Sequence, residues 1–206
     1  MFNRKCKITF INHGSTLYTE ENRLFDDENY PPINEIGRME MEKISHWIKA
    51  KGLKIDKIYS SSALRTIQSA RILSKVCKQD FEIISPLKSR KSGLWSGFTF
   101  KQIEQKYPDF LDNYHRDPEN YWPEGGENTK SLNIRVGEIL TKLINENIDK
   151  RLVVITHAEV IQAAIANALK IPAESQFKVY IPNGSATQIS YYTDWASLVY
   201  SAYLPL

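Results

Sequence analysis

Apolar and polar positions alternate along this chain between two spacings, one typical of strands and one typical of helices. Short apolar runs predict strands at Lys7–Ile11, Lys57–Tyr59, Phe81–Ser85 and Leu152–Ile155. Apolar residues three and four apart predict helices over Asn34–Lys51, from Ser61 or Ser62 to about Val76, over Ser131–Glu146 and over Glu159–Leu169. Strands that alternate with helices favour an α/β fold, here a three-layer sandwich with a mainly parallel sheet and helices on both faces.

Three details extend this prediction. The uninterrupted apolar run Leu152–Ile155 is typical of a central parallel strand that is covered on both faces. Thr99 and Gln102 have the spacing of a capping box, which predicts a helix start there. Two or three further strands are expected between Phe177 and Tyr203.

A length of 206 residues suits a single domain, so we expect one domain over residues 1–206. Within it, about residues 97–130 differ from the rest, because this stretch is rich in aromatic residues and is interrupted by Pro108, Pro118 and Pro123. We interpret these residues as an insertion that covers the site and call them the lid segment.

Composition narrows the functional class. The chain has 27 Lys and Arg against 24 Asp and Glu, and a net charge of +3 does not indicate a nucleic-acid partner. No apolar run approaches the roughly 20 residues that span a bilayer, so no membrane partner is expected. Cys6 and Cys77 form no CxxC or CxxH pair, and the N-terminal residues lack the apolar core of a secretion signal. Two reduced thiols favour a cytoplasmic protein.

Three candidate functional side chains come shortly after predicted strands. His13 follows the first strand, Arg65 follows the second, and His157 follows the run Leu152–Ile155. Ligands of open α/β sheets bind beyond the carboxyl ends of the strands, so we expect these three side chains to converge. An arginine with two histidines suits a tetrahedral anion: the guanidinium clamps it, one imidazole attacks phosphorus and the other stabilises the equatorial oxygens.

Each residue also has an ordinary explanation. A histidine after a strand is often a structural residue, and an arginine in the first turn of a helix is usually solvated. The combination of all three in one parallel sheet is what favours a site.

Six segments carry a family resemblance, in the family's order and over almost the whole chain: KITFINHGST, KIYSSSALRTIQSARIL, GLWSGFTFKQI, EGGEN, RLVVITHAEVIQAAI and NGSATQISYY. Together they resemble the phosphoglycerate mutase-like branch of the histidine phosphatase superfamily. The resemblance implies a covalent mechanism in which His13 takes up the phosphoryl group and passes it to water. It also implies that His157 and Arg65 bind the phosphoryl oxygens, and that no metal or cofactor takes part.

The resemblance gives Thr19 two interpretations. It stands where the family often has an asparagine that touches the phosphate, and it is otherwise a plain loop residue.

Two positions depart from the family pattern, and both departures remove charge. Asn12 stands where the family has an arginine directly before the nucleophile, although its amide can still donate two hydrogen bonds to the substrate. Ser89 stands where the family has its acidic proton donor. Glu127 in EGGEN is the nearest candidate carboxylate for proton transfer, and its alternative role is to anchor the lid segment.

Three functions remain open from the sequence. The first is hydrolysis of a small phosphorylated metabolite, and a substrate with a good leaving group, such as an acyl phosphate or a phosphohistidine, would need no acid. The second is non-phosphoryl chemistry that uses His13 and His157 as acid and base. The third is a non-catalytic member that binds a ligand. The expected partner of the enzyme is a small molecule, whereas the non-catalytic member would bind a phosphorylated ligand or a protein. A homodimer is an open alternative to a monomer.

Overall fold

A six-stranded mixed sheet forms the centre of the protein, for which the computed structural model describes residues 4–25 and 31–205. Its strand order is β3-β2-β4-β1-β5-β6. The strands are β1 (Arg4–Asn12), β2 (Lys57–Ser60), β3 (Phe81–Ile83), β4 (Lys150–Thr156), β5 (Ala186–Tyr192) and β6 (Ala196–Tyr203). The pairs β1–β4, β4–β2 and β2–β3 are parallel, and β5 is antiparallel to both of its neighbours. The predicted α/β fold with a mainly parallel sheet is confirmed.

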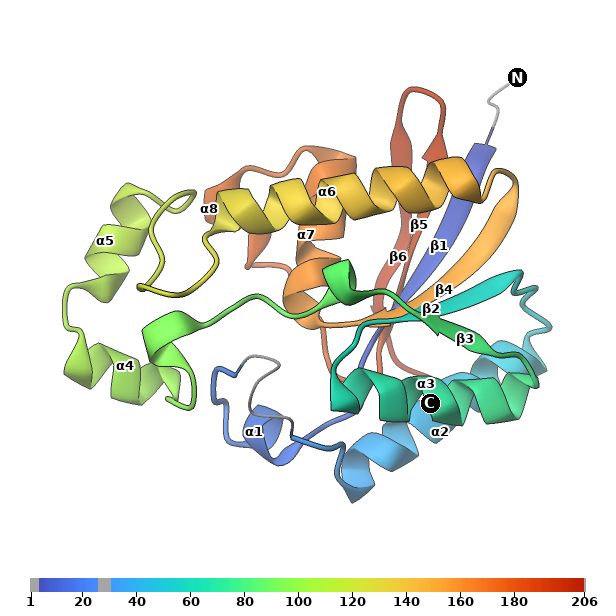
Figure 1. Cartoon of the computed structure of the whole chain (residues 1–206), viewed down its shortest axis with the longest axis horizontal. Helices are drawn as coiled ribbons and strands as arrows, with labels where there is room; N and C mark the ends of the chain where they lie inside the picture. Colours follow the sequence, from blue (N-terminus) through green and yellow to red (C-terminus); the bar gives the residue numbers. More distant parts are fainter. Residues whose placement is uncertain (1–3, 26–30, 206) are drawn as a thin grey trace.

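Two helices cover each face of the sheet (Figure 1). Helices α2 (Glu35–Ala50) and α3 (Leu64–Cys77) pack on one face, and α6 (Thr129–Glu146) and α7 (Ala158–Leu169) on the other. Side chains of a strand point alternately to its two faces, so β1 contributes to both cores. Ile8 and Phe10 pack with α6 and α7, whereas Ile11 packs with α2 and α3.

Side chains set several helix starts. The Asn34 side chain accepts a hydrogen bond from the backbone N–H of Gly37 at 2.9 Å, at the start of α2. The predicted capping box of Thr99 and Gln102 is confirmed at the start of α4 (Phe100–Lys106). The predicted serine cap of α3 is wrong: the helix begins after Ala63 without a side-chain cap.

The lid segment carries α4 and α5 (Phe110–Arg116), which stand apart from the layers of the sandwich in Figure 1. Its helices pack on a cluster of their own, whose buried members are Trp95, Ile103 and Phe110. Trp95 belongs to the short 3-10 helix η3 (Gly93–Trp95), which follows η2 (Ser85–Leu87). Two single-turn helices, α1 (Leu17–Glu20) and α8 (Ala173–Gln176), complete the described elements. That the segment covers a site stays a prediction.

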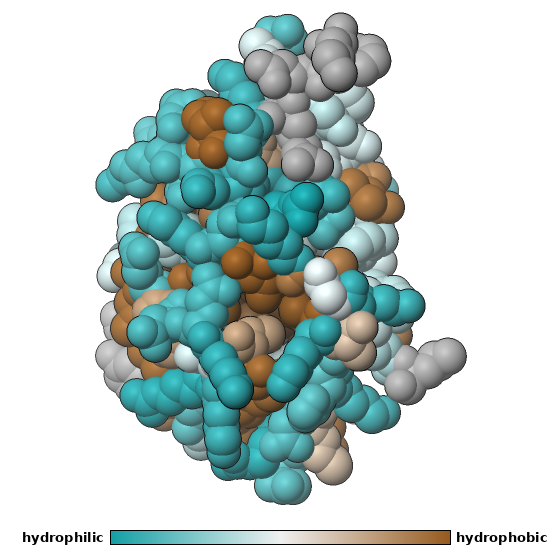
Figure 2. Space-filling view, turned by 90° about the vertical axis from the view of Figure 1, so that its right-hand side faces the viewer, coloured by the Kyte–Doolittle hydropathy of each residue, from teal (hydrophilic) through white to brown (hydrophobic). Residues whose placement is uncertain are grey.

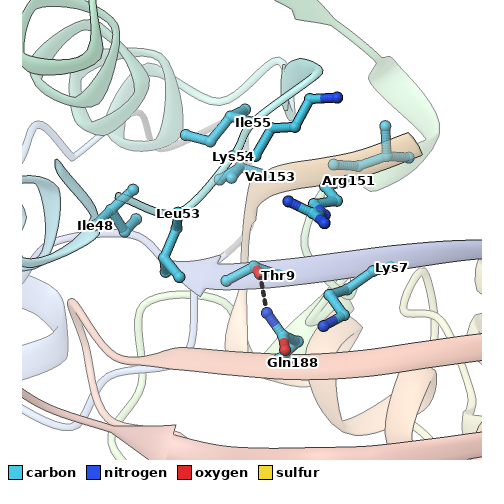
Figure 3. Close-up of a pocket in the computed structure, with 10 residues that line it drawn as sticks. Lys7, Thr9, Ile48, Leu53, Lys54, Ile55, Arg151, Val153 and Gln188 are labelled. Atoms are coloured by element: carbon cyan, nitrogen blue, oxygen red, sulfur yellow. Dashed lines mark hydrogen bonds between the residues drawn. The ribbon is translucent and has the colours of Figure 1, made fainter. Parts of the chain in front are cut away.

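The side on which β1, β2 and β4 begin faces the viewer in Figure 2, which shows an apolar hollow framed by hydrophilic side chains. A cavity of about 270 Å³ on this side is drawn in Figure 3, with Lys7 and Arg151 at its rim and a 2.9 Å hydrogen bond from Gln188 to Thr9. This cavity lies at the amino ends of the parallel strands, so it is separate from the strand ends that carry the candidate chemistry. Among residues 4–25 and 31–205, no helix is both long and apolar enough to cross a bilayer.

Candidate active site

His13 follows the last residue of β1, and its backbone N–H donates to the carbonyl of Thr156 at the end of β4, at 3.1 Å. The imidazole is 4% exposed, and its Nδ1 lies 2.8 Å from the carbonyl oxygen of Gly14. A carbonyl oxygen only accepts, so Nδ1 carries the hydrogen and Nε2 keeps its lone pair. The second nitrogen is thus available as a nucleophile.

Gly14 lets the loop after β1 approach α2 closely. A Cβ atom added at Gly14 would lie 2.3 Å from the carbonyl oxygen of Gly37, at a distance that real side chains do not reach. The backbone N–H of Gly14 also donates to the hydroxyl of Ser69 in α3, at 3.1 Å. Both contacts fix the backbone that positions His13.

His157 is the N-cap residue of α7, where β4 passes into the helix. Its Nε2 lies 2.9 Å from the hydroxyl of Ser61, which follows β2. Its Nδ1 lies 3.1 Å from Nη2 of Arg65. A guanidinium only donates, so Nδ1 is the acceptor and Nε2 carries the hydrogen that it gives to Ser61.

Arg65, in the first turn of α3, links the two histidines. Its Nε donates to Nε2 of His13 at 3.3 Å, while its Nη2 reaches His157. The two imidazole rings lie 5.3 Å apart between centroids, and Arg65 is 1% exposed. The predicted convergence of the three side chains is confirmed, whereas their catalytic roles stay predictions.

Burial and the nearby cation keep both imidazoles neutral. Burial, with the guanidinium of Arg65 as a smaller cause, lowers the pKa of His13 from 6.5 to about 3, although the bond to Gly14 opposes the shift. Burial also lowers the pKa of His157 well below its usual value, with Arg65 and His13 as further causes. One buried arginine beside two neutral imidazoles makes a site that favours an anion.

Asn12 does not direct its amide donors at the site. Its Nδ2 donates to the carbonyl oxygens of Ile181 and Pro182, at 3.2 and 3.1 Å. These bonds tie β1 to the loop before β5. Asn12 also lines the pocket that holds the histidines, and its contact with a substrate stays a prediction. Within the described part of the chain, the buried Oδ1 atom has no hydrogen-bond partner.

Ser89 and Thr19 line the same pocket as the histidines. Ser89 lies between η2 and η3 and is 4% exposed. Its side chain is a hydroxyl, so this position places no carboxylate in the pocket. The Thr19 hydroxyl closes the turn at the start of α1, since it donates to the Thr16 carbonyl at 2.9 Å and accepts from the Thr16 N–H at 2.8 Å. The structure thus gives Thr19 a local role in the loop, and its contact with a phosphate stays a prediction.

Glu127 lies outside the pocket that holds the histidines. Its two carboxylate oxygens accept from Nε and Nη2 of Arg135 in α6, at 2.7 and 2.6 Å. The same guanidinium donates to the carbonyls of Pro86 and Lys88, at 2.7 and 3.1 Å. These contacts favour the alternative role of Glu127, which is to anchor the end of the lid segment to α6, and its catalytic role stays a prediction.

The histidine pocket, as we call the space lined by His13, Arg65 and His157, has a volume of about 240 Å³. Glu159, two residues after His157, is the one carboxylate among the described residues that line it. Asn183 also lines it and donates to the carbonyl of His13 at 2.9 Å. The sequence analysis did not single out either residue for the site. A signal was present, because Glu159 lies in THAE just after β4 and Asn183 lies in NGSATQISYY just before β5.

Comparison with known proteins shows which proteins this chain is similar to. The model of the histidine phosphatase superfamily (branch 1) matches residues 8–202. Fructose-2,6-bisphosphatase of Saccharomyces cerevisiae is 25% identical over 176 residues, which are 85% of this chain and 37% of that protein. The 2,3-bisphosphoglycerate-dependent phosphoglycerate mutase of Parvibaculum lavamentivorans is 27% identical over 183 residues, 86% of this chain and 87% of that one. The structure of Bacillus stearothermophilus YhfR superposes with a TM-score of 0.86 at 21% identity and covers 96% of both chains.

Proposed function

Because this chain belongs to the histidine phosphatase superfamily, we propose that it hydrolyses a small phosphorylated metabolite through a phosphohistidine on His13. The observation that carries the proposal is the 2.8 Å bond from Nδ1 of His13 to the Gly14 carbonyl. It holds the tautomer in which Nε2 bears a lone pair, and this nitrogen points at the guanidinium of Arg65. A nucleophile and an anion-binding group therefore share one small pocket.

In the first step, the lone pair of Nε2 of His13 forms a bond to phosphorus while the bond from phosphorus to the leaving oxygen breaks. Arg65 stabilises the negative charge on the phosphoryl group as it is transferred. This stabilisation is stronger than in water because the site is buried. The His13 imidazole needs no base to activate it, because burial and Arg65 keep its pKa near 3.

In the second step, a water molecule attacks phosphorus and the bond to Nε2 breaks. Inorganic phosphate leaves, and His13 returns to its neutral form. The proton that the water loses ends on the phosphate or on the departed oxygen. The names of the matched relatives, a bisphosphatase and a mutase of phosphorylated metabolites, support a phosphorylated small molecule as substrate.

The site favours this function over the two others that the sequence leaves open. Arg65 donates a hydrogen bond to each of the two neutral imidazoles. If the histidines acted as acid and base on a neutral substrate, this buried cation would have no role in the reaction. A non-catalytic member would not need the tautomer of His13 to be fixed. A homodimer and a cytoplasmic location remain predictions of the sequence alone.

The test is detection of the phosphoenzyme. Incubation with acetyl phosphate and a panel of phosphate monoesters, followed by alkaline quenching and mass spectrometry, should place one phosphoryl group on His13. His13→Ala should abolish both the label and phosphate release, whereas His46→Ala, which alters an exposed histidine of α2, should keep them. No label and no turnover with any of these compounds would refute the proposal, and tight vanadate inhibition would count against the non-phosphoryl alternative.

A further inference from the structure

A second cavity adjoins the histidine pocket between the lid segment and α7. We call it the aromatic cavity; its volume is about 460 Å³, within the range of small-molecule sites. The two spaces share part of their lining, namely Leu24, Phe100, Ala158 and Glu159. A molecule whose phosphoryl group lies at His13 can therefore extend its leaving group into the aromatic cavity.

The walls of this cavity are aromatic and are fixed before any ligand arrives. The Trp95 ring lies edge-on to Trp122 and to Phe110, with centroids 5.0 and 5.2 Å apart. The indole N–H of Trp122 donates to the carbonyl of Lys91 at 2.8 Å, and Trp95 is 2% exposed. Edge-to-face packing of this kind holds each ring in one orientation, so the cavity offers rigid apolar surfaces to a flat group.

Arg90 adds to this rigidity from a buried position. Its guanidinium carbon lies 3.3 Å from the ring centroid of Trp122 and 4.9 Å from that of Phe177. Its Nε donates to the backbone carbonyl of Glu127 at 2.7 Å. The cation attracts the electron-rich faces of both rings, so Arg90 links Phe177 of the main body to Trp122 of the lid segment.

The reaction sets a second requirement on the leaving group. Position 89 carries a hydroxyl in place of a carboxylic acid, so it provides no proton donor near neutral pH. Unless Glu159, the one carboxylate among the described residues that line the histidine pocket, supplies a proton, an alkoxide is then a poor leaving group, because the pKa of an alcohol is near that of water, about 15.7. A phenolate leaves far more readily, since the pKa of a phenol is about 10.

These two observations are independent, and both point to the same class of substrate. We propose, on the premise of the phosphatase function above, that the substrate is the phosphate ester of a phenolic hydroxyl on a flat apolar body. The body binds in the aromatic cavity, between the lid segment and α7. His13 attacks phosphorus, the bond from phosphorus to the aryl oxygen breaks, and the electron pair leaves on the phenolate. Water then releases phosphate from His13 and supplies the proton that the phenolate takes up.

Three esters separate the two parts of the proposal. Phenyl and benzyl phosphate both carry one ring, but only the first has a phenolic leaving group. We expect kcat/KM for phenyl phosphate to exceed that for benzyl phosphate by at least about 100-fold. Phenyl and 2-naphthyl phosphate have leaving groups of similar acidity but different size. We expect the naphthyl ester to exceed the phenyl ester by about tenfold, because it buries a second ring.

A variant of the cavity wall tests where the second ring binds. Leu111 lies on α5, lines the aromatic cavity and is 41% exposed, so Leu111→Asp places a charge there with little risk to folding. It should reduce the naphthyl-to-phenyl ratio to about one, and Leu111→Met should restore the ratio. Leu94→Asp is the matched control, because Leu94 is 55% exposed and lies outside both cavities. It should leave the ratio unchanged.

The outcomes distinguish this inference from the proposed function. Turnover of phosphate esters with equal rates for phenyl and benzyl phosphate would overturn the leaving-group assignment while the phosphatase function stands. In particular, turnover of benzyl phosphate that is lost in Glu159→Gln would show that this carboxylate supplies the missing proton. A naphthyl-to-phenyl ratio that survives Leu111→Asp would overturn the cavity assignment. Absence of a phosphoenzyme with every compound would refute the function and the inference with it.

Discussion

Nε2 of His13 and Nε of Arg65 lie 3.3 Å apart, with the guanidinium donating to the imidazole. The lone pair that attacks phosphorus in the proposed mechanism is therefore already directed at the group that binds the anion. A bound phosphoryl group would take over the donors of Arg65 and release the lone pair for attack. The two functions of the site are thus linked through one side chain.

Replacing Arg65 with lysine should lower kcat/KM by about 100-fold or more. A lysine ammonium keeps the charge, but it lacks the planar fork that reaches both histidines at once. The measurement is steady-state hydrolysis together with the inhibition constant of vanadate, which should rise in parallel. Arg71→Lys, on the exposed side of the same helix, is the control and should behave like the wild type. Equal activity of the two variants would contradict the role of Arg65.

The depressed pKa of His13 should make the protein less stable in acid. The unfolded chain binds a proton near pH 6.5, whereas the native imidazole takes one up only near pH 3. Stability is therefore lost as the pH falls below 6.5, by about 2 kcal/mol from this residue between pH 6.5 and 5. Urea unfolding at several pH values checks the slope, which His13→Phe should flatten and His46→Ala should leave unchanged. NMR titration should show His13 still neutral at pH 5.

Ser61 should act as a positioning residue for His157. Its hydroxyl accepts the Nε2 hydrogen at 2.9 Å, which leaves Nδ1 directed at Arg65. Ser61→Ala should reduce kcat by about tenfold and Ser61→Thr should restore it, because the tautomer of His157 depends on this acceptor. Nitrogen-15 NMR of His157 should show a changed tautomer in the alanine variant. Ser62→Ala, at the exposed neighbouring position, should change neither observable.

Glu127 should contribute to stability rather than to chemistry. Its carboxylate and Arg135 are 14% and 18% exposed, and Glu127→Gln leaves this guanidinium without its charged partner. We expect the free energy of unfolding to fall by about 1–3 kcal/mol, as when a charged group loses its hydrogen-bond partner. Glu124→Gln, on the exposed turn nearby, should cost nothing measurable. A loss of kcat above 100-fold at unchanged stability would restore Glu127 as the proton donor.

Asn12→Asp should destabilise the protein. The change replaces an amide that donates to the carbonyls of Ile181 and Pro182 with a carboxylate that repels them. The carbonyl of Ile181 loses the amide donor of Asn12, whereas that of Pro182 still accepts from the hydroxyl of Ser185 at 2.7 Å, so we expect a loss of about 1–3 kcal/mol in urea unfolding. The same loss at pH 4 and pH 7 would argue against charge repulsion, since protonation of the new carboxyl should recover part of it.

The regular elements follow from local sequence. The centre of strand β4, Leu152–Ile155, is one apolar run, and α2, α6 and α7 each have an apolar face, so their spacing already predicts their type and nearly their ends. The start of α3 could not be predicted in this way. Ser61 looks like a cap in sequence, but its hydroxyl is held by His157, which lies 96 positions further along the chain. Local propensity gives way here to a contact between distant residues.

The sequence alone determined the α/β fold and the meeting of His13, Arg65 and His157, because parallel strands bring their carboxyl ends to one edge of the sheet. Only the tertiary structure decided the partners of Asn12 and Glu127 and the existence of the aromatic cavity. Each depends on groups that are far apart in sequence, and the geometry of such contacts is set by packing. A polar residue beside a motif can face a substrate or another loop, and only the folded chain fixes which.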